Sequence, residues 1–425
     1  MTGNRNSDQR SSRVLVLSDH RGQLDRRIAA QVNTLVASGR AVTLVSVPTA
    51  IGEGLLDSRV RVVMPAAAQL QAGAAAKHRA AGLPEPLKRA LWRLWYLAAA
   101  NLPRPLVPEF DMHNLALFGR LAPPRPPAVI HCHDLSTLLA GIMLRRKLNP
   151  AAKLVYDSHE LYPHQWPSRN FRKYWSGVEA EAIAQVDLVV TINPSVAGHL
   201  ARSYGLERVE VIYNSFADTV STGQEHQPLE PGEFLEHFQA PDGGFKIVTH
   251  VGSLHHKNSD DLVRAFGHLD ADMRLFLLAD AASARRLARL CRRRGISNVF
   301  FGDWVSPSRV LYYLVRADLG VIPYRGDRVL NRRLCSPNKL FEYIEAGVPI
   351  CASDLPELRR LIMDNGIGRV YPMHNAGQIA EALRDCRRRA QDGEFTAEAL
   401  EQARRKYQWS TQGEKLLRLY DEMGV

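Results

Sequence analysis

The chain repeats one short pattern along most of its length: an apolar segment, an amphipathic segment and a second apolar segment. Near the start, residues 13–17 and 41–47 predict two strands, and the segment between them predicts a helix that Gly39 ends. Apolar side chains share one face of that helix: Ile28, Val32, Leu35 and Val36. Two strands joined by a helix at this spacing form a βαβ unit, whose strands lie parallel. The pattern therefore favours an α/β fold class built on parallel sheets.

The pattern occurs in two series, separated by a segment of different composition. The first series continues through the apolar segments 127–134, 152–160 and 186–193, and the second begins at residue 245. Between them, residues rich in glycine, proline and charge are typical of a linker with room for one short helix. We therefore predict the following organisation: a disordered tail at 1–12, a first Rossmann-like domain at 13–215, a linker at 216–244, a second Rossmann-like domain at 245–405, and a C-terminal helix at 406–425 that can cross back to the first domain.

The composition narrows the class of protein. With 425 residues, 45% of them hydrophobic and 23% charged, the chain has the profile of a soluble globular protein of two or three domains. The polar start lacks an apolar signal core, no apolar run reaches the length of a membrane span, and the five cysteines form no CxxC pair. These features predict a reducing, cytoplasmic setting without a disulfide framework or a zinc knuckle.

The formal net charge of +11 suits a phosphorylated substrate, an anionic membrane or a nucleic acid. The basic residues occur in small clusters, such as 292–294 and 387–389, which we interpret as solvated helix faces. We therefore expect no nucleic-acid partner. The sequence DAD at 270–272 precedes a predicted strand instead of following one, so we expect no metal site there.

The stretch 336–350, SPNKLFEYIEAGVPI, predicts a helix with a marked start and a marked end. Ser336 can cap it, Pro337 suits its first position, and Gly347 is a natural stop before the next strand. The free N–H groups at the start of a helix form an anion site.

Three polar residues on this helix share one face: Asn338, Lys339 and Glu342. Lys339 adds a cation to the anion site, and Glu342 adds a hydrogen-bond acceptor one turn later. A ligand with both phosphate and hydroxyl groups, such as a nucleotide, fits this combination. The alternative is a capped helix with a Lys–Glu pair, and the stretch alone leaves both interpretations open.

Parallel sheets bind ligands at the carboxyl ends of their strands, and a cleft between two such domains is the expected active site. Polar residues follow the predicted strands at Asp19, His20, Arg21, His133, Asp134, Asp157, His159, Glu160, residues 252–257, Gly302 and residues 336–342. His133 and His159 are candidates for chemistry because each has an acidic neighbour. A purely structural role stays open for both.

Several segments in both halves together resemble one known family. They include DRRIAAQVNTLVASG, HCHDLSTLLAG, KLVYDSHELYP and VVTINPSVAGHL in the first half, and THVGSLHHKNSDDLVRAF and PNKLFEYIEAGVPICASDLPEL in the second. In this order they resemble retaining glycosyltransferases of the GT-B fold, family 4 (glycosyl transferases group 1). The resemblance covers most of residues 13–421.

The resemblance implies transfer of a hexosyl-type sugar from a nucleotide-diphosphate donor, with retained configuration, in polysaccharide or glycoconjugate synthesis. The second domain would hold the donor, and the first would present a glycan or lipid-linked acceptor. Neither a metal nor a cofactor beyond the donor is implied.

The resemblance also implies roles for particular residues. Glu342 matches the glutamate that holds the ribose, Lys257 a lysine that contacts the diphosphate, and His133 a histidine near the reacting sugar. We take these three as the catalytic set. The donor-binding set comprises Gly252, Ser253, Lys257, Gly302, Ser336, Asn338, Lys339 and Glu342.

Two positions depart from the family pattern. Leu334 stands where many members have a second glutamate, and Ser253 stands where many have an arginine. Phosphate binding would then depend on Lys257, Lys339 and backbone N–H groups. Two alternatives follow: a nucleotide-sugar epimerase of the same fold, and a catalytically silent relative that acts as a binding partner.

Residues 86–105, PLKRALWRLWYLAAANLPRP, combine basic and aromatic side chains on a predicted helix. They suit an interfacial helix on anionic lipid, which would place the protein at the inner membrane face. The alternative is a surface helix that packs its tryptophans inward. If the segment binds lipid, the protein will co-sediment with anionic vesicles, and changing Lys88, Arg89 and Arg93 to Glu will abolish this. Unchanged co-sedimentation of that variant would exclude the lipid-binding role.

Overall fold

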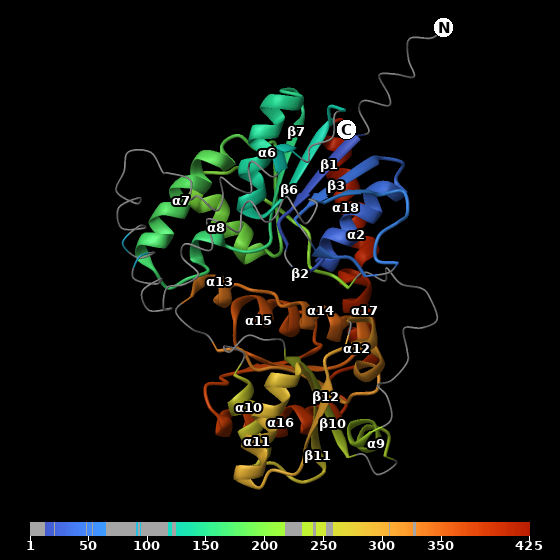
Figure 1. The fold of residues 1–425 in the computed structure, drawn as a ribbon. Helices are drawn as coiled ribbons and strands as arrows, with labels where there is room; N and C mark the ends of the chain where they lie inside the picture. The colour runs from blue at the N-terminus through green and yellow to red at the C-terminus, as the bar shows by residue number, and fades with distance from the viewer. Residues whose placement is uncertain are drawn as a thin grey trace. The chain divides into compact units, whose positions relative to one another are not determined.

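The computed structural model describes residues 13–20, 22–47, 49–52, 54–64, 91, 94, 118–120, 125–216, 232–240, 244–251, 258–305, 307–325 and 329–425. The chain divides into two compact units (Figure 1). The first holds residues 1–213, 328–332 and 412–425, and the second holds residues 214–327 and 333–411. The predicted tail at 1–12 lies outside the described residues.

The first unit contains a parallel sheet of seven described strands in the order β5-β3-β1-β6-β7-β8-β9. These strands are β1 (Arg13–Ser18), β3 (Ala41–Ser46), β5 (Arg61–Val63), β6 (Val129–His133), β7 (Lys153–Ser158), β8 (Leu188–Thr191) and β9 (Glu210–Val211), and the short β2 (Gly22–Gln23) and β4 (Thr49–Ala50) pair separately. The helices are α2 (Arg26–Ala37), α6 (Asp134–Leu148), η1 (Tyr162–His164), α7 (Arg169–Ile183), α8 (Pro194–Tyr204) and α18 (Trp409–Glu422). The strand order reverses between β1 and β6, and ligands bind α/β sheets at such a point.

The second unit contains a parallel sheet of six described strands in the order β12-β11-β10-β13-β14-β15. Its strands are β10 (Phe245–Val251), β11 (Met273–Ala279), β12 (Val299–Asp303), β13 (Leu319–Ile322), β14 (Ile350–Ser353) and β15 (Gly368–Tyr371). Its helices are α9 (Glu233–Gln239), α10 (Ser259–Phe266), α11 (Ala281–Arg294), α12 (Pro307–Leu314), α14 (Asn338–Ala346), α15 (Pro356–Met363), α16 (Ala376–Gln391) and α17 (Ala397–Tyr407), and the short α13 (Leu330–Arg333) spans the boundary between the units. Here the order reverses between β10 and β13.

Burial explains why these segments adopt this fold. The strands have continuous apolar sequences because helices cover both faces of a parallel sheet. In β1, the residues from Val14 to Leu17 are at most 3% exposed. The apolar face predicted for α2 is buried, Asp25 caps the helix, and Gly39 follows it with a left-handed φ of 91°. The α/β prediction is confirmed.

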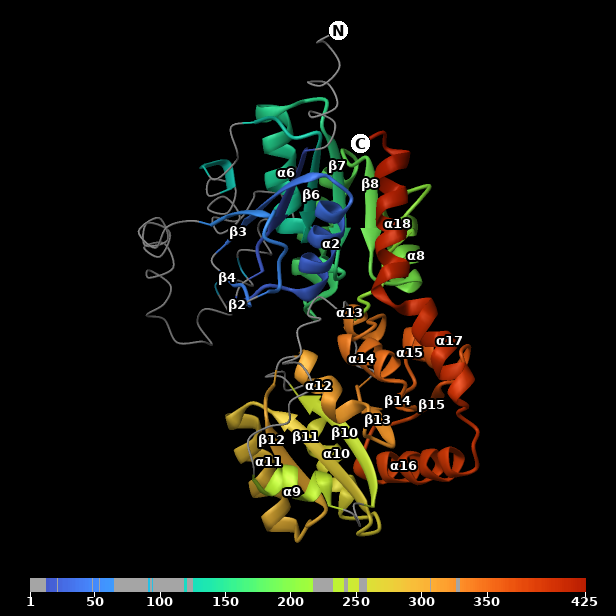
Figure 2. The same ribbon diagram turned by 90° about the vertical axis from the view of Figure 1, so that its right-hand side faces the viewer.

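The C-terminal helix α18 packs against the sheet of the first unit (Figure 2). Tyr420 is fully buried, and its hydroxyl oxygen lies 2.7 Å from Nδ1 of His131 in β6. Two ion pairs support the same packing: Arg40–Asp421 at 2.7 Å and Lys415–Glu210 at 2.6 Å. The chain therefore completes the core of its first unit with its last residues.

The structure corrects one detail of the stretch 336–350. The helix α14 begins at Asn338, and Pro337 occupies the cap position with extended backbone. Ser336 is buried one residue earlier, so the prediction that it caps the helix is wrong. Gly347 ends the helix with a left-handed φ of 66°, as predicted.

In the predicted linker, residues 217–231 and 241–243 lie outside the described residues. The part between them forms α9, whose Phe234 and Phe238 pack edge-on against Phe276 and Tyr313 of the second unit. This stretch therefore belongs to the core of the second unit.

Of the predicted interfacial segment 86–105, the structure describes Leu91 and Leu94, and both are exposed. No helix in the described part of the chain is both long enough and apolar enough to cross a membrane.

Gly320 in β13 marks a close contact between the sheet and α14. A Cβ atom there would lie 2.6 Å from the ring of Tyr343, whose buried hydroxyl donates toward backbone carbonyls of β10 and β13. Because the ring cannot move away easily, Gly320→Ala will destabilise the protein by about 1–3 kcal/mol in urea unfolding.

Gly177→Ala is the matched control, because no atom lies within 4 Å of a Cβ at this helical position. That change will be neutral or will stabilise by up to about 1 kcal/mol. An equal effect of the two substitutions would contradict the close packing at Gly320.

Candidate active site

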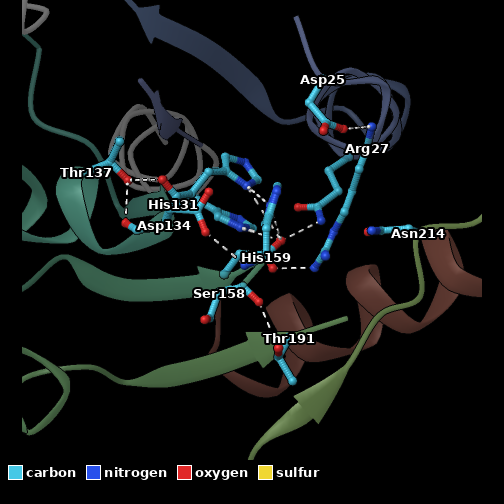
Figure 3. Close-up of polar contacts among 12 residues, drawn as sticks. Asp25, Arg27, His131, Asp134, Thr137, Ser158, His159, Thr191 and Asn214 are labelled. Carbon is cyan, nitrogen blue, oxygen red and sulfur yellow. Dashed lines mark hydrogen bonds and ion pairs between the residues drawn. The ribbon is translucent and has the colours of Figure 1, made fainter. Parts of the chain in front are cut away.

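A buried carboxylate lies at the centre of a polar cluster in the first unit. Figure 3 shows Arg27, His131 and His159 of this cluster, whose side chains point toward one another. Asp157 is in β7, directly beside His133 at the end of β6. It is fully buried and forms an ion pair with the guanidinium of Arg27 from α2. Gln31, one turn further along α2, donates from Nε2 to the second carboxylate oxygen at 2.7 Å. Both oxygens of Asp157 are therefore held by α2.

Three histidines surround Oδ2 of Asp157. The distances to it are 3.7 Å from Nε2 of His131, 3.6 Å from Nδ1 of His133 and 3.6 Å from Nε2 of His159. Nδ1 of His133 also lies 3.0 Å from Nε2 of His159, and the rings of His131 and His133 stack with centroids 4.7 Å apart. The carboxyl ends of β6 and β7 thus bring together three of the sequence-predicted residues: His133, Asp157 and His159.

The charges in the cluster are unevenly distributed. Burial disfavours the charged form of Asp157, but Arg27 and then His159 hold its pKa well below the usual range. Burial, followed by the charges of His131 and His159, lowers the pKa of His133 well below its ordinary value, so this imidazole is neutral. Burial and the charge of Arg27 lower the pKa of His159. The carboxylates of Asp134 and Asp157 outweigh them, so the pKa of His159 is raised above its ordinary value.

One nitrogen of His133 is left open. Its Nε2 atom is buried and has no hydrogen-bond partner among the described residues. A buried polar atom without a partner carries a desolvation penalty of about 1–3 kcal/mol. Nε2 of His131 and Oε1 of Gln31 in the same cluster are also buried without a hydrogen-bond partner among the described residues. Unpartnered buried atoms gathered in this way indicate a place where ligand atoms are expected.

Asp134 has an unusual backbone conformation next to His133. Its φ is 68°, in the left-handed region that residues other than glycine rarely adopt. Its side chain accepts a hydrogen bond from the backbone N–H of His159 at 3.0 Å. Strained backbone of this kind concentrates at functional sites. The bond to His159 compensates for part of the strain and ties α6 to β7.

The donor atoms of His131, His133 and Asp157 lie within 4.8 Å of one another, a spacing that a metal ion could bridge. The guanidinium of Arg27 contacts the same carboxylate, however, so a divalent cation would sit beside a buried positive charge. The cluster is better explained as an ion pair surrounded by histidines.

The sequence DAD at 270–272 has a structural role, since Asp272 forms an ion pair with Arg387.

In the second unit, a second buried carboxylate lies close to the point where the strand order reverses. Glu342 of α14 is 2% exposed, and its Oε2 lies 2.6 Å from Nε2 of His250 near the end of β10. Lys339, 3% exposed, donates from its ammonium to the backbone carbonyl of His250 at 2.7 Å. The ammonium also lies 5.6 Å from the ring centroid of Tyr324. His250 therefore joins the two helix residues to the sheet.

The remaining predicted donor-binding residues are distributed as follows. Asn338 begins α14 and accepts a hydrogen bond from Asn214 at 3.3 Å. Gly302 lies in β12, which β11 separates from β10, so the structure does not bring it to the carboxylate of Glu342. Gly252, Ser253 and Lys257 lie outside the described residues.

Each half of the chain matches the model of a known protein family. Residues 59–217 match the family described as Glycosyltransferase Family 4, and residues 245–388 match the family described as Glycosyl transferases group 1. The chain carries glycosyltransferase domains.

A curated relative and two solved structures are similar to these glycosyltransferase domains. A phosphatidyl-myo-inositol mannosyltransferase of Mycobacterium leprae (strain TN) is 32% identical over 99 residues, which are 21% of this chain and 26% of that protein. Sucrose-phosphate synthase from Thermosynechococcus elongatus has a TM-score of 0.66 at 16% identity and covers 97% of this chain and 99% of its own. HepE of Anabaena in complex with UDP has a TM-score of 0.64 at 14% identity, covering 96% and 100%. The structures establish the GT-B fold with its two Rossmann-like domains, as predicted.

Four residues of these glycosyltransferase domains escaped the sequence analysis as site residues: Gln31, His131, His250 and Tyr420. Arg27 escaped it as well; it lies in the first turn of α2, which Asp25 caps by accepting from the backbone N–H of residue 27 at 2.8 Å. A signal was present, since positions 27 and 31 place polar side chains beside the buried face of α2.

The ionisation of Asp134 makes the stability of the first unit depend on pH. Burial, opposed by His159, raises the pKa of Asp134 from 3.8 to about 7. A carboxyl group with a raised pKa stabilises the fold while protonated, and that stability is lost as the pH rises through the folded pKa. Asp134→Asn keeps the acceptor oxygen, tolerates positive φ and cannot ionise.

We therefore expect Asp134→Asn to match the wild type in urea unfolding near pH 4 and to exceed it by more than about 1 kcal/mol at pH 8. Asp134→Ala, which lacks the acceptor, will be less stable than Asp134→Asn at both pH values. A constant difference between wild type and Asp134→Asn across this range would refute the assignment.

Proposed function

We propose that the protein is a glycosyltransferase that transfers a hexosyl-type sugar from a nucleotide-diphosphate donor to a glycan or lipid-linked acceptor, with retention of configuration. The observation that carries this proposal is the buried Glu342, positioned by His250 close to the strand reversal of the second unit. The two matched families and the GT-B fold support the same reaction class.

The donor would bind in the second unit. A carboxylate is an acceptor of hydrogen bonds only, so Glu342 suits the two hydroxyl groups of a ribose. His250 holds one of its oxygens at 2.6 Å, which fixes the orientation of the other. HepE, which shares the fold, has been solved with UDP and with UDP-glucose, which supports a nucleotide sugar as the donor here.

The departing diphosphate would meet positive charge and helix N–H groups. The N-terminus of α14 at Asn338 supplies N–H groups close to Glu342. The ammonium of Lys339 is already bound to the carbonyl of His250, so it would contribute its positive charge without direct contact to the phosphate. Direct contact would fall to Lys257. Groups fixed in this way before the reaction stabilise developing charge without reorganising.

The neutral His133 would act near the transferred sugar from the first unit, with its open Nε2 as the contacting atom. We further propose that the donor is bound without a metal and that the protein works in the cytoplasm, peripherally at the inner membrane face, in the synthesis of a polysaccharide or glycoconjugate. An epimerase of the same fold would need no acceptor, and a silent relative would transfer nothing. Nucleotide binding and sugar transfer, measured together, distinguish the transferase from the epimerase and from the silent relative.

A thermal-shift panel tests the donor site. We expect one of UDP, GDP, CDP or ADP, or its sugar conjugates, to stabilise the wild type by about 2.7 kcal/mol at 100 times its Kd. Glu342→Ala will abolish the shift, because the ribose loses its acceptor, and His250→Ala will weaken it. Glu381→Ala, an exposed position on α16, is the control and will retain it.

A shift that survives Glu342→Ala would move the donor site elsewhere. If no nucleotide shifts the wild type, the silent relative is favoured. Leu334→Glu, which restores the family's second glutamate, then tests whether this departure is the cause. Transfer of sugar to an added acceptor, measured with the nucleotide that binds, separates the transferase from the epimerase.

A further inference from the structure

We propose that His159 is a positioning residue that fixes the tautomer of His133: it donates from Nε2 to Nδ1 of His133, so that His133 presents an Nε2–H donor to an oxygen of the bound sugar. The proposal rests on the proposed function for its ligand, a sugar, but the tautomer itself is a property of the free protein.

The contact between the two histidines requires one donor and one acceptor. Nδ1 of His133 and Nε2 of His159 are 3.0 Å apart, and the rings meet nearly edge to face at 74°. A neutral imidazole carries its single proton on one nitrogen only. If His133 accepts at Nδ1, its own proton must therefore be on Nε2. If it donates at Nδ1, Nε2 is a bare lone pair.

The surrounding charges favour His159 as the donor. Two acidic side chains lie beside it: the ionised Asp157, 3.6 Å from its Nε2, and Asp134, which accepts from its backbone N–H at 3.0 Å and is charged above its raised pKa of about 7. Among the described residues, the one carboxylate within ion-pair distance of the His133 ring is Asp157, whose charge Arg27 also neutralises, and His133 stacks on the ring of His131. The opposite pKa directions of the two histidines agree with this, since burial and like neighbours keep His133 neutral while carboxylates favour the charged form of His159.

The rest of the cluster allows the same assignment. Tyr420 lies 2.7 Å from Nδ1 of His131 and can donate its hydroxyl proton there. His131 then carries its own proton on Nε2, which faces Asp157 at 3.7 Å. Both histidines of β6 are thus Nε2–H tautomers, and neither Nε2 has a hydrogen-bond partner among the described residues. That of His131 still has the carboxylate of Asp157 at 3.7 Å, so the Nε2–H of His133 is the one we assign to a ligand.

A donor at this place recognises an acceptor oxygen, such as a sugar hydroxyl or a ring oxygen. The charge on His159 polarises His133 through the Nε2-to-Nδ1 bond and so strengthens the hydrogen bond that His133 donates. A bare lone pair at Nε2 would instead select a donor group from the ligand. The tautomer therefore decides which atom of the sugar His133 can contact.

Long-range ¹H–¹⁵N spectra of histidine-labelled protein test this directly. The chain has 15 histidines, and His133→Gln identifies the resonances of residue 133 by their loss. We expect a proton on Nε2 of His133 in the wild type. In His159→Phe, we expect the proton on Nδ1, because Asp157 is then the nearest partner. His164→Phe, on η1, removes a histidine that pairs with His199 and will leave the signals of His133 unchanged.

The wild-type spectrum decides the proposal even if a variant fails to fold: a proton on Nδ1 of His133 overturns it. So does an unchanged tautomer in a folded His159→Phe, or one equivalent of zinc in the purified protein, which would occupy the lone pairs. In sugar transfer, His159→Phe will lower kcat about 10²-fold with KM for the donor nearly unchanged. If no nucleotide binds, the proposed function fails while the tautomer can still be measured.

Discussion

The ion pair between Arg27 and Asp157 is the constraint on which the polar end of the first sheet depends. Both side chains are buried, so neither charge is tolerable without the other, and removing one partner of such a pair typically costs about 3–5 kcal/mol. The pair fastens α2 to β7 at the carboxyl end of the sheet. Because Asp157 is held ionised, it orders His131, His133 and His159 around one oxygen. The orientation of His133 therefore depends on the buried ion pair between Arg27 and Asp157.

Parallel topology explains why part of this site was predictable. Strands that run in one direction bring all their carboxyl ends to the same edge, so polar residues after separate strands meet there. His133 and Asp157 pair directly across β6 and β7, and the sequence pattern alone placed both at strand ends. The resemblance to family 4 then distinguished His133 and Glu342 from the other polar residues.

The residues that escaped prediction share a physical cause. His131 lies within a strand that is buried throughout, and His250 follows three consecutive buried residues of β10, so the alternation that separates the two faces of an exposed strand is lost. Tyr420 is 289 residues from its partner His131, and periodicity carries no information about such contacts. The predicted cap of α14 is one residue early because Ser336 and Pro337 both carry start signals, whereas the backbone stays extended at Pro337 and turns helical at Asn338.

The two units solve the same electrostatic problem with different residues. Each places a buried carboxylate near the reversal of its strand order and holds it with a hydrogen-bonded side chain: Asp157 with Gln31, and Glu342 with His250. A cation accompanies each one, Arg27 in ion-pair contact and Lys339 through the backbone carbonyl of His250. A carboxylate fixed in this way is an acceptor whose orientation is set before a ligand arrives, so binding loses little to reorganisation.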